Sequence, residues 1–418
     1  MTRTPMTPSQ SCRVLIAGAG PAGMATALYL LGEHPELAGQ VIALEKARHP
    51  RPKVCAGGLI PKTMLAMEEL GLELDVPAVE VRAGLARTEV GEAELGGGRR
   101  PGTGEVLCTI VRRDRFDARL AGAARARGLK IVEDCRVLDL EQAAGCARVL
   151  TDRGVFEGQV VVGADGSGSR VAAKVFGCRK ASIGRALMVD VPVERDRAPE
   201  FSRGAYRFDF NCVKAGIRGY SWSFPCLIDS RPHLNVGIYD QCPRLAVEPG
   251  TPKAPMLDQL RAAFPELALG AGRIRYQAFP IRWHDASDRF ASGRVILAGD
   301  AAGCDPLLGE GISCAFEHGK LAARSIASFL NGDEAALARY DRELHRGAVG
   351  RKLGKLAFAA RRFYGPHHRL FFRLAMLSRR AQQIGVDWYN GSHHTDEVAV
   401  PMLIAIWLKS VLFPASVR

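Results

Sequence analysis

The first apolar segments of the chain follow the pattern of a strand, a helix and a second strand. Residues 14–17 form a short apolar run that suits a buried parallel strand. Residues 21–31 have helical composition, and residues 41–44 form a second apolar run that ends at Glu45. This order predicts a βαβ unit, and therefore a parallel sheet, near the start of the chain.

Later segments show two further patterns. Apolar runs at 159–162 and 295–298 lead into turns rich in glycine and aspartate, as buried parallel strands do, and a helical pattern extends from Arg113 to Gly128. Three other segments alternate with period 2, which predicts antiparallel strands: Tyr206, Phe208 and Phe210; Tyr220, Trp222 and Phe224; Leu234, Val236 and Ile238.

These patterns predict an α/β protein with a discontinuous Rossmann-type domain, an antiparallel β domain and a helical C-terminal region. The length of 418 residues also favours two or three domains. The expected nucleotide-binding parts are residues 12–80, 105–180 and 279–335. Residues 81–104 and 181–278 are expected in the β domain, and residues 336–418 in the helical region.

Composition is that of a globular protein, with 47% apolar and 24% charged residues. The polar residues 1–12 are expected to form a loose lead-in, and no signal peptide is expected before the first strand. The 11 cysteines are odd in number and scattered without a C-x-x-C pair, which argues against a disulfide framework or a zinc site. We therefore expect no metal and a cytoplasmic location.

The net charge of +13 is concentrated towards the end of the chain. Residues 339–380 contain 12 Lys or Arg and 2 Asp or Glu, interleaved with aromatic residues, and residues 398–413 are mostly apolar. The apolar run is too short and interrupted for a membrane span. The region suits either peripheral contact with an anionic membrane or a helical domain with a solvated basic face. No nucleic-acid recognition motif accompanies the charge, and the oligomeric state cannot be inferred.

Three glycines follow the first strand in G-x-G-x-x-G spacing. Gly18 allows a tight turn, Gly20 lets backbone approach a pyrophosphate, and Gly23 allows close packing of helix on strand. The helix N-terminus at residue 21 offers free N–H groups to an anion. Glu45, at the end of the second strand, can accept hydrogen bonds from ribose hydroxyls. The sequence therefore predicts a nucleotide cofactor at this end.

Two further strands end in acidic turns that suit the same ligand. Asp165-Gly166 follows one strand and Gly299-Asp300 another, at the carboxyl edge of the predicted sheet, where ligands bind. A plain tight turn is the alternative for Asp165. After Pro306, the turn 309–312 opens a long helix whose N-terminus would face developing negative charge.

These blocks resemble the flavoprotein superfamily of para-hydroxybenzoate hydroxylase, in its geranylgeranyl reductase branch. The resemblance covers about residues 12–335 and implies that FAD is the cofactor. It implies that Arg113 lies near the ribityl-phosphate region, that Asp300 binds the ribityl chain and that residues 309–312 lie at the isoalloxazine ring. The cofactor-binding residues that follow are Gly18, Gly20, Pro21, Ala22, Gly23, Glu45, Lys46, Cys55, Ala56, Gly57, Arg113, Asp165, Gly166, Gly299, Asp300, Gly309, Gly311 and Ile312.

Two motifs carry the resemblance to the reductase branch. Residues 53–58 read KVCAGG, similar to a C-x-G-G segment beside the flavin, which makes Cys55 a candidate proton donor or else a small buried hydrophobe. Residues 220–225 read YSWSFP, similar to a motif that lines a prenyl pocket, although Ile217 stands where that motif begins with proline. The predicted substrate residues are Tyr206, Tyr220, Trp222, Phe224 and Pro225.

The resemblance implies hydride transfer from reduced flavin N5 to a C=C bond of an isoprenoid. No second G-x-G-x-x-G follows a strand, so electrons are expected from transiently bound NADPH or from a protein donor such as ferredoxin. A flavin monooxygenase or halogenase acting on an aromatic metabolite is the alternative. A non-catalytic prenyl-binding module would have eroded flavin motifs, whereas this chain keeps them.

Overall fold

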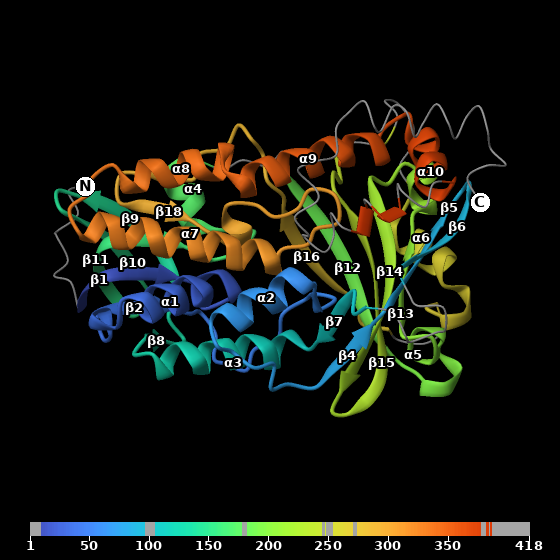
Figure 1. Cartoon of the computed structure of the whole chain (residues 1–418), viewed down its shortest axis with the longest axis horizontal. Coiled ribbons are helices and arrows are strands. Elements are labelled where there is room, and N and C mark those ends of the chain that lie inside the picture. Colours follow the sequence, from blue (N-terminus) through green and yellow to red (C-terminus); the bar gives the residue numbers. More distant parts are fainter. Residues whose placement is uncertain are drawn as a thin grey trace.

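The structure is a computed structural model that describes residues 10–96, 105–177, 182–244, 247, 254–270, 274–377, 382–383 and 385–386. The apolar run at 398–413 and most of the polar lead-in lie outside these residues. Two large sheets lie side by side along the molecule, and the elements of the chain pass repeatedly from one sheet to the other (Figure 1).

The first sheet has the parallel core that the apolar runs predict. β1 pairs in parallel with β11 and β2, β11 with β18, and β2 with β8, whereas β9, β10 and β17 add antiparallel pairs. Its strands are β17 (Ala291–Ser292), β18 (Val295–Leu297), β11 (Gly154–Gly163), β1 (Gln10–Ala17), β2 (Val41–Leu44), β8 (Lys130–Val132), β10 (Cys146–Thr151) and β9 (Val137–Ala143). The carboxyl ends of β1, β11 and β18 therefore meet at one edge.

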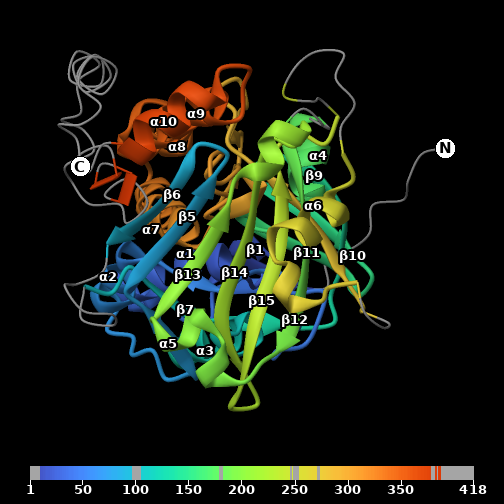
Figure 2. The same ribbon diagram turned by 90° about the vertical axis from the view of Figure 1, so that its right-hand side faces the viewer.

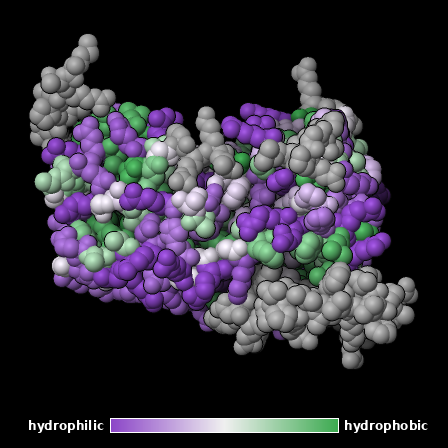
Figure 3. All heavy atoms as spheres, turned by 90° about the horizontal axis from the view of Figure 1, so that it is seen from above, coloured by the Kyte–Doolittle hydropathy of each residue, from purple (hydrophilic) through white to green (hydrophobic). Residues whose placement is uncertain are grey.

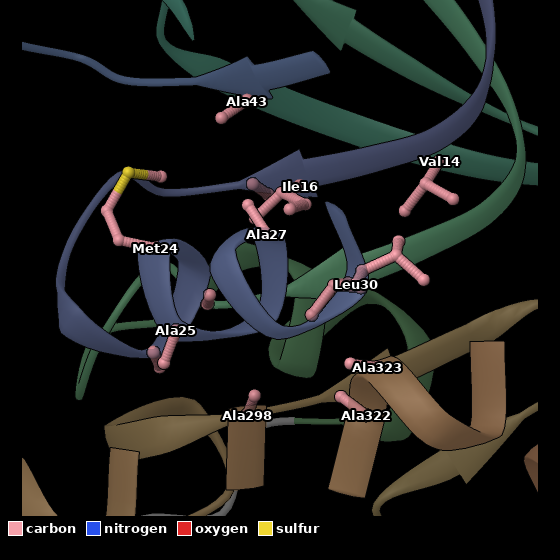
Figure 4. Packing of buried hydrophobic residues seen from close by; sticks show 14 of the residues in the cluster. Val14, Ile16, Met24, Ala25, Ala27, Leu30, Ala43, Ala298, Ala322 and Ala323 are labelled. Atoms are coloured by element: carbon pink, nitrogen blue, oxygen red, sulfur yellow. The ribbon is translucent and has the colours of Figure 1, made fainter. Parts of the chain in front are cut away.

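Helix α1 (Pro21–Glu33) is buried between this sheet and α7 (Ile312–Leu330). Figure 4 shows Ala27 and Leu30 of α1 close to Ile16 and Val14 of β1, with Ala322 and Ala323 of α7 on the opposite side of the helix. The two helices pack closely because they meet through small residues: a Cβ on Gly319 of α7 would lie 2.7 Å from Ala25 Cβ of α1. The first and last parts of the predicted nucleotide-binding domain thus share one core.

The second sheet is mostly antiparallel, as predicted, with one parallel pair, β13 with β5. Its order is β16 (Gln277–Arg282), β12 (Ile183–Pro192), β15 (Arg231–Asp240), β14 (Gly219–Ile228), β13 (Ala205–Asp209), β5 (Ala83–Thr88) and β6 (Gly91–Gly96). Helix α6 (Met256–Ala263) covers the face seen in Figure 2, and the first sheet and α1 lie behind. The central strands β14 and β15 are consequently buried on both faces, whereas the edge strands β6 and β16 are partly exposed.

A third, small sheet connects the two large ones. It consists of β3 (Gly58–Leu59), β7 (Cys108–Val111) and β4 (Ala78–Val81). The remaining helices that precede α7 are α2 (Pro61–Glu69), α3 (Arg113–Ala126), α4 (Arg170–Phe176) and α5 (Pro199–Ser202). Short 3₁₀ turns occur at Pro35–Leu37, Arg195–Arg197, Asn211–Ala215, Pro265–Leu267 and Gly299–Ala301.

The described C-terminal residues are helical, which confirms the predicted fold class. Helices α8 (Ala336–Arg346), α9 (Ala348–Phe363) and α10 (His368–Leu377) run from the first sheet to the second (Figure 1). Tyr364 and Phe372 pack into the aromatic cluster of the second sheet. Viewed from above, the surface is mostly hydrophilic with scattered apolar patches (Figure 3). None of the helices in the described ranges is long and apolar enough to cross a bilayer.

Candidate active site

One cavity of about 610 Å³ is lined by residues of both large sheets. Glycine-rich turns at the carboxyl edge of the first sheet line one part, which we name the nucleotide end: Gly18, Gly20, Glu45, Gly166 and Gly299. Aromatic side chains of the second sheet line the other part, which we name the aromatic chamber: Phe208, Tyr220, Trp222, Phe224 and Tyr239. The two parts are continuous.

The turn between β1 and α1 leaves no room for side chains. Gly18 has φ +106°, and a Cβ there would lie 2.3 Å from the carbonyl oxygen of Ala164. A Cβ on Gly23 would lie 2.0 Å from the carbonyl oxygen of Gly18, so Gly23 packs beneath the turn and does not line the cavity. No side chain caps α1 at Gly20, and its first N–H groups can therefore bind an anion.

Glu45 and Arg51 form the charged border of this turn. The buried Glu45 carboxylate accepts hydrogen bonds from Ala19 N at 3.0 Å and Ala47 N at 3.1 Å. Arg51 Nε lies 3.5 Å from Glu45 Oε1 and has no hydrogen-bond partner in the described part of the chain. Lys46 also lines the cavity. An orphaned guanidinium N–H beside a free helix N-terminus fits the phosphate and ribose groups of a nucleotide.

Asp165 lies at the predicted sheet edge, but its carboxylate caps a helix. It accepts hydrogen bonds from Ser169 Oγ at 2.5 Å and from Arg170 N at 2.7 Å, at the start of α4. The alternative of a local turn therefore accounts for its side chain. The backbone of Asp165 and Gly166 (φ +85°) still lines the cavity and leaves room for a ligand.

A buried histidine fixes the turn after β18. Gly299 N donates a hydrogen bond to His318 Nδ1 at 3.1 Å, and burial lowers the pKa of His318 to about 4, so the ring is neutral at pH 7. Asp300 lines the cavity and accepts a hydrogen bond from Ser167 Oγ at 3.2 Å. The Asp300 carboxylate can therefore also accept hydroxyl groups of a bound chain.

The turn from Gly309 to Ile312 borders the point where the two parts of the cavity meet. Gly309 (φ +69°), Gly311 and Ile312 all line the cavity. A Cβ on Gly311 would lie 3.0 Å from Asp300 Oδ1, which keeps this backbone bare. Glu310 Oε1 accepts a hydrogen bond from Ser313 N at 2.8 Å and so caps α7 instead of pointing to a ligand.

The K-V-C-A-G-G segment also lies in the cavity wall. Cys55, Ala56 and Gly57 line it, and a Cβ on Gly57 (φ +79°) would lie 1.9 Å from the carbonyl oxygen of Val111. Gly57 N donates to Cys55 Sγ at 3.4 Å. The thiol also interacts with the Arg113 guanidinium, so Gly57 and Arg113 hold the Cys55 side chain in the cavity wall.

The wall contains two cations, the buried Arg113 and the half-buried Lys53. Arg113 forms a two-pronged pair with Asp117, with Nε–Oδ1 at 2.8 Å and Nη2–Oδ2 at 3.1 Å. Lys53 Nζ lies 3.4 Å from the centroid of the Phe279 ring. Burial lowers the pKa of Lys53 to about 8, although the Asp300 carboxylate opposes this effect. An anionic ligand nearby would therefore raise the pKa of Lys53 and favour its protonated form.

The substrate residues expected from the sequence divide between two faces of the sheet. Tyr220, Trp222 and Phe224 line the cavity from β14. Tyr206 is buried behind them, with its ring stacked on Phe224 at 5.1 Å, and does not line the cavity. Pro225 is wrongly placed by the sequence interpretation, because alternation puts it on the opposite face of β14.

Sequence reasoning missed several wall residues, of which Tyr239 is the most informative. The alternation of Leu234, Val236 and Ile238 identifies the face of β15 that packs on α6, whereas Tyr239 belongs to the cavity face. The alternation was predicted correctly, but the residue that lines the cavity is on the opposite face of the strand from the three apolar residues. Arg51 was missed because it belongs to no motif, and Lys53 because it opens the KVCAGG segment outside the C-x-G-G part that carries the resemblance. The other missed residues include Ala186, Met188, Phe279, Ile281 and Leu308.

The cysteines that the structure describes form no disulfide, and no group of three potential metal ligands gathers within the described ranges.

Comparison with known proteins identifies the family of the chain. Residues 11–353 match the family described as FAD binding domain. The chain is 29% identical over 364 residues to the chloroplastic geranylgeranyl diphosphate reductase of Oryza sativa, covering 82% of this chain and 73% of that protein. It is 28% identical over 331 residues to the menaquinone reductase of Mycolicibacterium smegmatis, covering 75% and 76%.

Solved structures show the same fold. A geranylgeranyl bacteriochlorophyll reductase-like protein from Thermoplasma acidophilum superposes with a TM-score of 0.68 at 20% identity, covering 97% of each chain. The flavin-dependent brominase Bmp2 has the same TM-score at 19% identity, covering 96% of this chain and 98% of its own. The fold alone therefore does not separate alkene reduction from oxidative chemistry.

Proposed function

The chain belongs to the FAD binding domain family and is an FAD-dependent oxidoreductase, and from this premise we propose that it reduces C=C bonds of an isoprenoid chain. The observation that supports this substrate class most directly is the continuity of the aromatic chamber with the nucleotide end. Each buried CH₂ group contributes about 0.8 kcal/mol, so a hydrocarbon chain can bind there with few polar contacts.

In this proposal the nucleotide end holds FAD. The bare turn at Gly18 and Gly20 and the start of α1 receive the pyrophosphate, and Glu45 accepts the ribose hydroxyls. Arg51 supplies a cation beside the same turn. Asp300 accepts hydroxyls of the ribityl chain, while Gly309 and the residues up to Ile312 border the ring.

When bound and reduced, FAD supplies a hydride from N5. The protein residues orient the substrate, exclude water and deliver a proton. We assign proton delivery to Cys55, because this residue lines the cavity and its thiol lies beside Gly57 of the K-V-C-A-G-G segment. Lys53 and Arg113 keep positive charge beside that wall, which favours an electron-rich ligand.

The proposal is tested by anaerobic stopped-flow absorbance. The purified FAD-bound protein is photoreduced, and geranylgeranyl diphosphate or menaquinone is added without oxygen. We expect the oxidised flavin absorbance to return and the product to gain two hydrogen atoms. Absorbance that stays bleached until oxygen is admitted, with an oxygenated or halogenated product, would instead establish the monooxygenase or halogenase alternative.

The proposed role of Cys55 is tested in the same assay. Cys55→Ala should slow anaerobic reoxidation by about 100-fold, the scale of general acid catalysis, while FAD content stays unchanged. Cys146→Ala, a part-exposed thiol on β10, is the matched control and should leave the rate unchanged. An unchanged rate in Cys55→Ala would reduce Cys55 to a packing residue.

The electron donor belongs to the proposal as well. We expect reduction by NADPH or by a ferredoxin-type protein, and the rate of flavin bleaching with each donor separates them. A donor that bleaches the flavin within the catalytic turnover time is the physiological type.

The basic face of α9 supports peripheral contact with an anionic membrane. Arg351, Arg361 and Arg362 are exposed there, and Phe358 is 47% exposed. Cations beside an apolar side chain suit a surface of anionic lipids. Sedimentation with vesicles containing anionic lipid should fall when Arg361 and Arg362 are replaced by Glu, and equal sedimentation with neutral vesicles would remove this assignment.

A further inference from the structure

Tyr239 is the exception among the polar aromatic side chains of the second sheet. Trp222 Nε1 donates to Asn235 Oδ1 at 2.9 Å, and the Tyr220 hydroxyl donates to the carbonyl oxygen of Leu308. Tyr364 donates to the carbonyl oxygen of Leu307 at 2.7 Å. The Tyr239 hydroxyl is buried and has no hydrogen-bond partner among the described residues.

The phenol end of Tyr239 lies in the cavity wall near the turn at Gly309. A Cβ on Gly309 would lie 4.0 Å from Tyr239 Cζ, and a Cβ on Gly184 would lie 2.8 Å from Tyr239 Cε2. The ring also packs against Tyr220, with centroids 5.8 Å apart. The side chain is therefore held in place by β12 and β14, and its hydroxyl lies at the junction of the nucleotide end and the aromatic chamber.

An unsatisfied buried hydroxyl costs about 1–3 kcal/mol, so such a group is expected to gain a partner when a ligand is bound. Burial raises the pKa of Tyr239 well above its usual range, and the hydroxyl therefore remains a donor at every physiological pH. The wall residues Met188 and Trp222 carry no charge, and the charged groups that act on Tyr239 are the carboxylates of Asp305 and Asp240. A neutral donor near carboxylates suits a neutral oxygen better than a diphosphate.

We propose that the Tyr239 hydroxyl donates a hydrogen bond to a neutral oxygen of the substrate, such as a quinone carbonyl or an alcohol. This rests on the proposed function for the isoprenoid part of the ligand and narrows its class. The aromatic chamber thereby selects prenyl compounds that carry such an oxygen over bare hydrocarbons, since a hydrocarbon leaves the donor unpaired.

The test compares two ligands and two variants of the FAD-bound protein. A naphthoquinone with a short prenyl tail and the prenylated naphthalene without its carbonyls are titrated into the oxidised protein, with tryptophan fluorescence as the signal. The wild type should bind the quinone about 10- to 100-fold more tightly, and Tyr239→Phe should lose this preference. Tyr364→Phe removes a hydroxyl outside the cavity wall and should keep the preference.

Thermal unfolding shows that the variants are compared as folded proteins. Tyr239→Phe removes an unpaired group and should keep the wild-type Tm, whereas Tyr364→Phe leaves the Leu307 carbonyl unpaired and should lower it. A quinone preference that survives in folded Tyr239→Phe overturns the proposal.

A second measurement tests whether the Tyr239 hydroxyl donates its hydrogen bond to a substrate oxygen or to a carbonyl of the flavin. If Tyr239→Phe shifts the flavin absorbance spectrum or midpoint potential without substrate, the acceptor belongs to FAD and the proposal is overturned. An unchanged spectrum and potential together with a lost preference supports it. Failure of alkene reduction with the binding preference intact would refute the proposed reaction and leave the Tyr239 assignment standing.

Discussion

The nucleotide end and the aromatic chamber are parts of one cavity, but they are built by different means. Backbone shapes the nucleotide end, where an added Cβ at Gly18 would overlap the carbonyl oxygen of Ala164. Side chains shape the aromatic chamber, where Tyr220 and Trp222 are fixed by hydrogen bonds from their polar tips. Backbone groups can bind a cofactor whatever the side chains are, whereas the fit to a substrate depends on which side chains line the chamber. The two parts should therefore respond differently to substitution.

The largest expected effect is at the glycine turn. Gly18→Ala introduces a Cβ 2.3 Å from the Ala164 carbonyl oxygen at φ +106°, so both sterics and backbone conformation oppose it. We expect FAD affinity to fall by at least about 1,000-fold, or about 4 kcal/mol. Flavin absorbance per protein after purification measures this. Gly122→Ala in α3, where a Cβ meets nothing within 4 Å, is the control and should retain full flavin.

A smaller effect is expected in acid, where His318 beneath the Gly299 turn should lower the stability of the folded protein. The pKa of buried His318 is about 4 against about 6.5 when unfolded, so the unfolded chain binds the proton first and stability falls as pH drops from 6.5 to 4. The contribution is on the order of 3 kcal/mol at pH 4. His318→Asn keeps an acceptor for Gly299 N without titrating.

Urea unfolding of the wild type and His318→Asn at pH 7 and pH 4 checks this expectation. The variant should lose clearly less stability on acidification. Burial also lowers the pKa of His284 to about 4, so some acid sensitivity will remain. Equal losses in the two proteins would show that the Gly299 turn does not depend on a neutral imidazole.

The smallest of these effects should be confined to the aromatic chamber. A Cβ on Gly237 would lie 2.2 Å from Trp222 Cζ2, so Gly237→Ala should displace the indole towards the cavity. We expect about 10-fold weaker substrate binding, with a loss of about 1–3 kcal/mol in stability. FAD content should stay near one per chain. Parallel loss of FAD would mean that the two parts are not independent.

The glycine turns could be predicted from sequence because glycine spacing records where backbone must come close to a ligand. Gly18, Gly57 and Gly309 all lie in the cavity wall. Side-chain roles were harder to predict. The Asp165 carboxylate caps α4 because nearby backbone N–H groups bind it. Pro225 lies on the far face of β14 because successive residues of a strand point to opposite faces.

The rest depends on contacts between segments that are distant in the chain. Strand β5 pairs in parallel with β13, more than a hundred positions later, and no local pattern signals this pairing. The strand β15 has apolar residues on both faces, so period alone could not tell which face meets the cavity. For the same reason Tyr239 could not be found before its unpaired hydroxyl was located in space.

The packing of α1 against α7 has a consequence for biosynthesis. Gly18 is made early, but Ile312, Ala315 and the helix that covers α1 leave the ribosome only after both sheets have been translated. A nascent chain that stops before α7 lacks one wall of the cavity and exposes the small-residue face of α1. The cavity is therefore complete only after α7 has been translated, when both sheets are already made.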